Sequence, residues 1–409
     1  MAYPNAWFVT TMQSFDSFLF ENPSAQITVR HIFEDNDNWA RYCYYHKDEL
    51  REVEVKEVVK MLRCHQDGNG FFVYHCPSCK ESWVVSNGCN SRICSECGKR
   101  YTDKWAKRLS TKMFDVIHRH LVLSVPDIVW YILRENKYSL KTFMDASIKA
   151  INETFKSISH STIVKGGAIV VLHPYGKDMG FKAHLHVFMT EGGFNKYRKF
   201  VHMKFIAYEV MRKTWQYHVL TELREVLPKT QKYNNLLNAC FTKYGNGFYI
   251  HMPEESRITS KKDIANYVGR YVRHPAIANT RISHYDGKSV VFWHYKDKSK
   301  KVKIYVKVTV EEFIRRIIQH IPEPQFKMIR YYGAYCRKWK RMYRHYIVQE
   351  SLTESIITKI RKKREYFCPN CGTKLKFDEK LDNPPPRKRI FGEFIGDWGK
   401  LSWGRSSLN

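Results

Sequence analysis

The stretch GAIVVLHPYGKDMGFKAHLHVFMT, residues 167–190, decides the fold of this chain. Its two apolar runs, 167–173 and 182–190, are rich in β-branched and aromatic residues, which are typical of β-strands. The segment PYGKDMGF between them carries glycine and aspartate, and this composition predicts a turn. The stretch therefore predicts a β-hairpin.

Three histidines lie on the predicted hairpin. His184 and His186 are two residues apart on one strand, so their side chains point to the same face, while the apolar residues beside them point to the core. If the two strands pair, His173 comes close to both. Three converging imidazoles leave open positions on a bound ion, as a catalytic metal needs. The alternative is that these are solvent-exposed or stacked histidines on a sheet face.

The segments around the hairpin predict an α+β domain. Residues 120–125, HLVLSV, are typical of a strand, and residues 140–160 have the spacing of an amphipathic helix. A shorter helix is expected at 261–273, and a second hairpin at 289–308. The order of strand, helix and hairpin favours a mainly antiparallel sheet with helices on one face.

Tyr267 and Tyr271 lie four residues apart on the predicted helix at 261–273. Residues at this spacing share one face, so both phenols can reach one site. A tyrosine hydroxyl can attack a phosphodiester and form a covalent phosphotyrosine, which keeps the bond energy for rejoining. Two tyrosines allow two successive cleavages. Because the chain has 26 tyrosines, simple packing of the pair is the competing explanation.

The eleven cysteines are clustered, which indicates metal sites rather than disulfides. Cys76-Pro-Ser-Cys79 and Cys94-Ser-Glu-Cys97 are two CxxC knuckles, and we expect these four cysteines to bind one structural zinc ion. A redox role is the alternative, but four cysteines in paired knuckles argue against it.

Four further cysteines are possible zinc ligands. Cys64 and Cys89 either bind a second zinc ion or are plain buried residues. Cys368-Pro-Asn-Cys371 is half of a zinc site. Its missing ligands are expected either from another chain or from two residues of this one, Cys336 and His345.

The charge of the chain points to a polyanionic partner. Lysine and arginine number 69 against 40 acidic residues, which gives a formal charge of +29, and aromatic residues make up 15%. Such an excess favours nucleic acid, with aromatic side chains available to stack on unpaired bases. A general surface excess or an acidic membrane surface would be the alternatives. No apolar run is long enough to predict a membrane span and no secretory signal is visible, so a cytoplasmic protein is expected.

Several motifs occur in an order that resembles the transposases of the insertion-sequence-91 family. These enzymes are HUH endonucleases, named for a His-hydrophobic-His motif. The resemblance covers about residues 30–375 and is carried by GCNSRICSECGKRYTDKWAKRL, HLVLSVP, VLHPYG, HLHVF, IANYVGRYVRHPAIANTRI, VVFWHYKD and MIRYYGAY. Phe72 and Ile93 stand where many of these transposases carry histidine. This departure argues against a full second zinc site and leaves the expected four-cysteine site intact.

The resemblance implies an HUH fold with a central antiparallel sheet and flanking helices. It implies Mg²⁺ or Mn²⁺ on His184 and His186, with His173 as third ligand, and Tyr267 and Tyr271 as nucleophiles. The reaction would cleave single-stranded DNA at an element end, hold the 5′ phosphate on tyrosine, release a 3′ hydroxyl and then join the strand to target DNA.

Four regions are expected along the chain. They are an N-terminal helical DNA-binding region at 1–63, a zinc-binding domain at 64–108, the HUH catalytic domain at 109–320, and a C-terminal helical region with the CxxC pair and a basic tail at 321–409.

The expected function is a DNA transposase of the rolling-circle type, acting on element ends and target DNA at the nucleoid. One rival is a plasmid or phage replication initiator or a relaxase, which shares the chemistry. A second is a non-catalytic, zinc-dependent DNA-binding regulator. A third is a metal-dependent nuclease that uses water and leaves no covalent adduct.

Overall fold

A computed structural model describes most of the chain as an α+β protein. The described residues are 27–65, 70–80, 82–159, 165–203, 207–252, 257–258, 260–272, 275–297, 301–347, 367–368 and 370–381. Residues 1–26 and the basic tail after residue 381, which the sequence analysis assigned to the terminal regions, lie outside this set.

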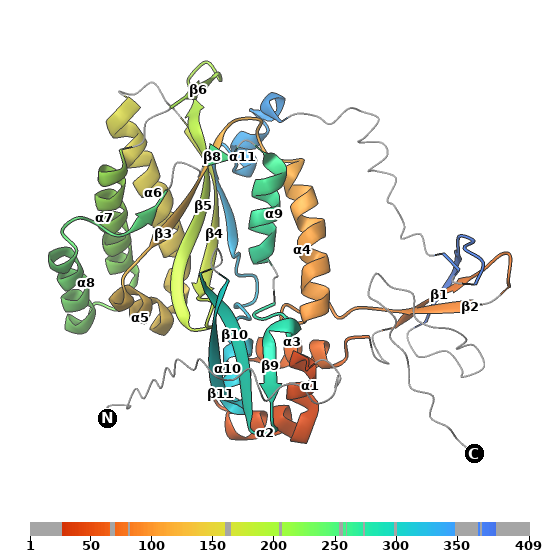
Figure 1. Ribbon diagram of the computed structural model, residues 1–409. Coiled ribbons are helices and arrows are strands. Elements are labelled where there is room, and N and C mark those ends of the chain that lie inside the picture. The colour runs from red at the N-terminus through yellow and green to blue at the C-terminus, as the bar shows by residue number, and fades with distance from the viewer. Residues whose placement is uncertain are drawn as a thin grey trace.

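A central antiparallel sheet forms the middle of the molecule (Figure 1). The strand order is β12-β4-β5-β3-β7, with β6 paired to β5 and β8 paired to β3. The predicted hairpin is present as β4 (Lys165–Tyr175) and β5 (Phe181–Phe194). The other strands are β3 (His118–Ser124), β6 (Phe200–His202), β7 (Ile250–His251), β8 (Arg257–Ile258) and β12 (Ile329–Gly333).

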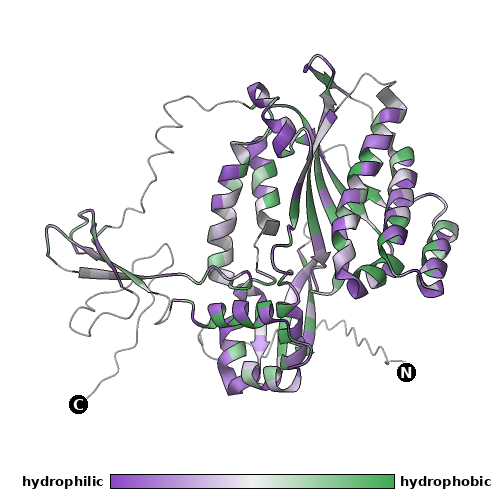
Figure 2. Ribbon diagram, turned by 180° about the vertical axis from the view of Figure 1, so that it is seen from behind, coloured by the Kyte–Doolittle hydropathy of each residue, from purple (hydrophilic) through white to green (hydrophobic). Residues whose placement is uncertain are grey.

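Helices cover both faces of this sheet, whereas the sequence pattern predicted one covered face. On one face of the sheet, alternate strand residues such as Val170 and Leu185 pack against four helices. These are α5 (Asp127–Glu135), α6 (Leu140–Ser159), α7 (Tyr208–Val226) and α8 (Gln231–Lys243). On the opposite face, the strand residues in between, such as Val171 and Phe188, pack against α4 (Ser95–Ser110) and α9 (Lys261–Val272). Figure 2 shows hydrophobic residues along the central strands and hydrophilic ones on the outward sides of the helices.

A second core lies below the central sheet in Figure 1. The N-terminal helices α1 (Val29–Glu34), α2 (Asn38–Tyr45) and α3 (Glu52–Leu62) enclose it together with helix α10 (Val310–Ile318). The predicted second hairpin is present as β10 (Ser289–Asp297) and β11 (Val302–Thr309), joined by β9 (Ile282–Tyr285). Thr309 begins α10 because its side chain accepts a hydrogen bond from the Glu312 amide.

A small sheet stands apart from the body in Figure 1. It consists of β1 (Phe71–His75), β2 (Ser82–Ser86) and β13 (Lys376–Leu381), in the order β13-β1-β2. We call it the outer sheet. It pairs the C-terminal end of the described chain with the strand that follows the N-terminal helices, since β13 lies antiparallel to β1.

The C-terminal region, which is expected to be helical, is described only in part. Its described part contains only one short α-helix, α11 (Arg337–Lys340), and contributes β12 to the central sheet and β13 to the outer sheet. Because β12 pairs along β4, the central sheet extends past residue 320. Among the described residues, no helix has the length and apolar character needed to cross a membrane.

Candidate active site and cysteine clusters

The three predicted histidines come together on the central sheet. Pairing of β4 with β5 sets His173 opposite His184, and His186 lies one position further on the same face. The ring centroids of His173 and His186 are 4.3 Å apart, and each lies 5.1 Å from that of His184. One nitrogen from each ring lies within 4.8 Å of the others. This spacing can hold one metal ion.

Hydrogen bonds prepare two of these rings for a metal. Nδ1 of His184 lies 2.7 Å from the Lys182 carbonyl oxygen, which can only accept, so Nδ1 carries the hydrogen and Nε2 keeps its lone pair. Nδ1 of His186 lies 2.9 Å from Nε2 of His120. The backbone and a fourth histidine therefore hold the orientation of these two rings.

Burial keeps the histidines neutral. It lowers the pKa of His186 to about 2, with smaller contributions from the neighbouring imidazoles His184 and His120. The pKa of His120 is lowered to about 4 by burial, and the pKa values of His173 and His184 are lowered for the same main reason. Neutral imidazole is the form that binds metal ions.

Tyr267 lies beside this trio. Its hydroxyl oxygen is 3.2 Å from Nδ1 of His186, and its ring packs 4.7 Å from that of His120 and 5.3 Å from that of Phe188. Tyr271 belongs to the same helix, α9, but its side chain lies outside the described residues. One of the two predicted nucleophiles is thus located at the histidines.

His120 is a site residue that the sequence analysis missed. It lies on β3, opposite Phe188 of β5, and its ring stacks between those of His186 and Phe188 at centroid distances of 5.2 and 4.7 Å. The available signal was the alternation of β3, because a strand that pairs with the His-x-His strand places every second residue on the same face.

Helix α9 approaches α4 closely through a glycine. A Cβ atom at Gly269 would lie 2.9 Å from the Cβ of Ala106 on α4, so no other residue fits there without a shift. Lys261 at the start of α9 forms an ion pair with Asp115 at 3.0 Å, and Lys262 is exposed. The side chain of Arg270 and all of Arg273 lie outside the described residues.

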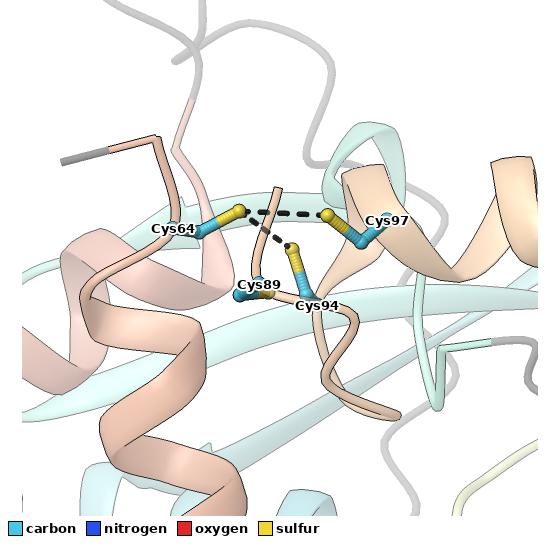
Figure 3. A group of neighbouring side chains, drawn as sticks. All are labelled: Cys64, Cys89, Cys94 and Cys97. Atoms are coloured by element: carbon cyan, nitrogen blue, oxygen red, sulfur yellow. Dashed lines mark hydrogen bonds between the residues drawn. The ribbon is translucent and has the colours of Figure 1, made fainter. Parts of the chain in front are cut away.

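The first group of cysteines, which we call the inner cluster, consists of Cys64, Cys89, Cys94 and Cys97 (Figure 3). The Sγ atom of Cys64 lies 3.6 Å from those of Cys94 and Cys97. Cys94 is the N-cap of α4 and Cys97 lies in its first turn. Cys64 and Cys89, which the sequence left without partners, therefore complete a site at the start of α4.

The second group, the outer cluster, consists of Cys76, Cys79, Cys368 and Cys371. The expected pairing of the two N-terminal knuckles is wrong, because the first knuckle lies on the outer sheet and the second at α4. The expected partners of the C-terminal knuckle, Cys336 and His345, are wrong as well. Pairing of β13 with β1 brings that knuckle to the first one within a single chain.

Two families of known proteins match parts of this chain. A family described as a putative transposase matches residues 167–342, which include the histidines and α9. A family described as a transposase zinc-binding domain matches residues 35–125, which include all four cysteines of the inner cluster.

Two relatives match over most of their length. The transposase for insertion sequence element IS801 from Pseudomonas savastanoi pv. phaseolicola is 27% identical over 320 residues, which is 75% of each chain. The putative transposase y4qJ from Sinorhizobium fredii (strain NBRC 101917 / NGR234) is 25% identical over 302 residues, covering 69% of this chain and 75% of the relative. No solved structure matches the chain.

Proposed function

This chain belongs to the insertion-sequence-91 family of transposases, and from that premise we propose that it cleaves and rejoins single-stranded DNA through a phosphotyrosine on Tyr267. The observation that carries the proposal is the position of the Tyr267 hydroxyl, 3.2 Å from His186 within the histidine site. The DNA would be the ends of an insertion sequence and its target, and the place of action the nucleoid.

The proposed step balances without an external energy source. The Tyr267 oxygen attacks the scissile phosphorus, a phosphorus–tyrosine bond forms, and the bond from phosphorus to the 3′ oxygen breaks. The tyrosine proton ends on the 3′ oxygen, which leaves as a hydroxyl. Joining is the reverse reaction with the 3′ hydroxyl of another strand. Because His186 Nδ1 lies at hydrogen-bond distance, it can hold the phenol oxygen in place during attack.

The three histidines fit a divalent cation. Their neutral nitrogens converge, and a bound Mg²⁺ or Mn²⁺ would supply Lewis-acid polarisation of a phosphate oxygen. Mg²⁺ prefers oxygen ligands, so a donor set of nitrogens favours Mn²⁺. On this basis we expect more cleavage in Mn²⁺ than in Mg²⁺ at equal concentration.

One face of the β9-β10-β11 sheet supports single-stranded DNA as the substrate. Trp293 and Tyr305 lie directly opposite each other on this face, and Tyr305 is 54% exposed. Lys303 places its ammonium 4.6 Å from the Trp293 ring, and Arg281 lies 5.7 Å from it. Aromatic rings that stack on bases, flanked by cations that bind phosphates, are typical of sites for unpaired strands.

A covalent-adduct assay tests the nucleophile. Labelled single strands that span the element ends are incubated with the protein and Mn²⁺, and the products are separated on a denaturing gel. We expect a protein–DNA adduct that Tyr267→Phe reduces and that the matched control Tyr217→Phe, an exposed tyrosine on α7, leaves unchanged. Cleaved DNA without an adduct would show that water is the nucleophile and would overturn the proposal.

The histidine site has its own test. His186→Ala removes a ligand and the contact to Tyr267, so cleavage should be lost while affinity for DNA stays nearly unchanged. His218→Ala is the control, because His218 is a half-buried histidine of α7 that pairs with Glu153 and is not one of the trio. Wild-type cleavage by His186→Ala in Mn²⁺ would contradict the role of the trio, and lost binding would assign His186 to DNA recognition instead.

A further inference from the structure

We propose that the outer cluster binds a second zinc ion, which holds the C-terminal end of the described chain against the hairpin of β1 and β2. Two of its ligands, Cys368 and Cys371, lie outside the residues matched by both families. The inference does not depend on the proposed DNA chemistry, since it concerns only how the chain is held together.

The sulfur spacing fits zinc. All four Sγ atoms lie within 4.8 Å of one another, and those of Cys76 and Cys371 are 3.5 Å apart. Four thiolates arranged tetrahedrally at about 2.3 Å from zinc stand roughly 3.8 Å from each other. A disulfide would bring two sulfurs to about 2.05 Å. The cluster has the spacing of metal ligands and not that of a disulfide.

The two knuckles also have the same backbone turn. In CPSCK the amide of Lys80 donates to the carbonyl of Cys76 at 2.9 Å, and in CPNCG the amide of Gly372 donates to that of Cys368 at 2.8 Å. Lys80 and Gly372 are both left-handed, with φ of 59° and 71°. In the first turn the Cys79 amide donates to the Cys76 sulfur at 3.3 Å, which stabilises a thiolate. Two equivalent turns thus present four sulfurs to one point.

The apolar core described for the outer sheet is small. Its buried cluster contains Trp83 and Leu375 beside Cys76 and Cys368, and Phe71 and Val73 of β1 are also buried. Small units of this kind are usually stabilised by a metal or by disulfides. In small metal-binding units the binding of zinc by thiolates is coupled to folding, so an ion at this position would stabilise the three short strands.

The position of the cluster gives the ion a further consequence. Cys79 and Cys368 lie on either side of the segment that contains the whole central sheet. Zinc at this point closes that segment into a loop, so the C-terminal strand β13 becomes part of the N-terminal zinc-binding region. The outer sheet is thus a unit assembled from both ends of the described chain.

The number of zinc ions tests the site. Native mass spectrometry of the full chain should count two zinc ions, and the double variant Cys368→Ser, Cys371→Ser should retain one. Cys43→Ser, a half-buried cysteine outside both clusters, is the matched control and should retain two. A wild-type chain with one zinc, or a double variant with two, would overturn the proposal.

Hydrogen exchange tests the fastening. In the wild-type chain the amides of β13 and β1 should be protected, and in the double variant both strands should lose protection while β4 and β5 keep theirs. If β13 stays protected without the second zinc ion, strand pairing alone holds the end of the chain and the proposed fastening is wrong. Neither measurement needs DNA cleavage, so each can fail while the proposed function stands.

Discussion

The inner and outer clusters have the same four-cysteine composition but very different surroundings. All four inner cysteines are buried, with 9% exposure or less, against residues of the second core such as Ile93 and Met61. In the outer cluster Cys371 is exposed and the neighbouring core is small. The comparison shows that cysteine number and spacing alone do not tell what a bound ion does for the fold.

The difference extends to the active site. The inner cluster includes the N-cap of α4, α4 packs on α9 at Gly269, and α9 carries Tyr267. No such connection leads from the outer cluster, whose strands pair only with each other among the described residues. We therefore expect loss of the inner ion to affect chemistry and loss of the outer ion to affect mainly the outer sheet.

The largest effect is expected from Cys94→Ser combined with Cys97→Ser. Without these ligands the start of α4 is no longer fixed, and a shift of about 1 Å in Tyr267 would reduce adduct formation by about 100-fold. The outer variant Cys368→Ser, Cys371→Ser is the comparison and should keep most of the activity on short single strands. Equal losses in both variants would contradict the separation of roles.

A smaller effect is expected from Gly269→Val, which separates helix packing from zinc binding. The added side chain meets Ala106, and overpacking of this kind costs about 1–3 kcal/mol. We expect a lower free energy of unfolding and reduced adduct formation, with two zinc ions still bound. Gly245→Ala is the control because no atom lies within 4 Å of its added Cβ. Unchanged adduct formation by Gly269→Val would show that α4 does not position the nucleophile.

The hairpin that carries the three histidines could be predicted because its signals are local. The alternation of polar and apolar residues in KAHLHVFMT places His184 and His186 on one face of the strand. The short connector pairs the preceding strand with this one, which sets His173 opposite His184. The helix of Tyr267 followed from spacing in the same way. Its contact with His186 did not, because it depends on the packing of α9 across the sheet.

The cysteine pairing could not be predicted for the opposite reason. Cys76 and Cys368 meet because β1 pairs with β13, more than 300 positions away in the sequence. Two CxxC knuckles close in sequence looked like the simpler site. Local spacing cannot decide how three CxxC knuckles and the single residues Cys64 and Cys89 combine. The missed His120 has the same cause, since its strand becomes a neighbour of β5 only in the folded sheet.

The pH dependence of stability offers a test that involves neither cluster's ligands. His118 is fully buried on β3 with Nε2 2.7 Å from the Tyr335 hydroxyl, and burial lowers its pKa to about 4. Below about pH 6.5 His118 is protonated in the unfolded chain but stays neutral in the folded chain. The contribution of neutral His118 to the free energy of unfolding is therefore complete above pH 6.5 and is lost towards pH 4. At pH 5 the loss from His118 is about 2 kcal/mol.

Urea unfolding at pH 7.5, 6 and 5 measures this loss. Zinc binding also weakens in acid as thiolates are protonated, so the wild-type chain alone is not informative. His118→Asn should lower stability at pH 7.5 yet show a shallower decline towards pH 5 than the wild-type chain. Identical declines would show that His118 is not the group responsible.

The smallest expected effect is on the affinity for unpaired DNA, and it compares the β9-β10-β11 sheet with the outer sheet as the binding site. Strand β11, VKIYVKVT, carries two lysines and no acidic residue, whereas β13, KFDEKL, carries two lysines and two acidic residues.

Tyr305→Ala removes an exposed ring next to the lysines of β11, and loss of one stacked base costs about 1–3 kcal/mol. Fluorescence anisotropy with a labelled single strand should therefore show weaker binding, with Phe377→Ala on β13 having less effect because its acidic neighbours repel phosphate. If Phe377→Ala weakens binding more than Tyr305→Ala does, the single strand follows the outer sheet, and the ion proposed there would serve DNA recognition as well as the fold.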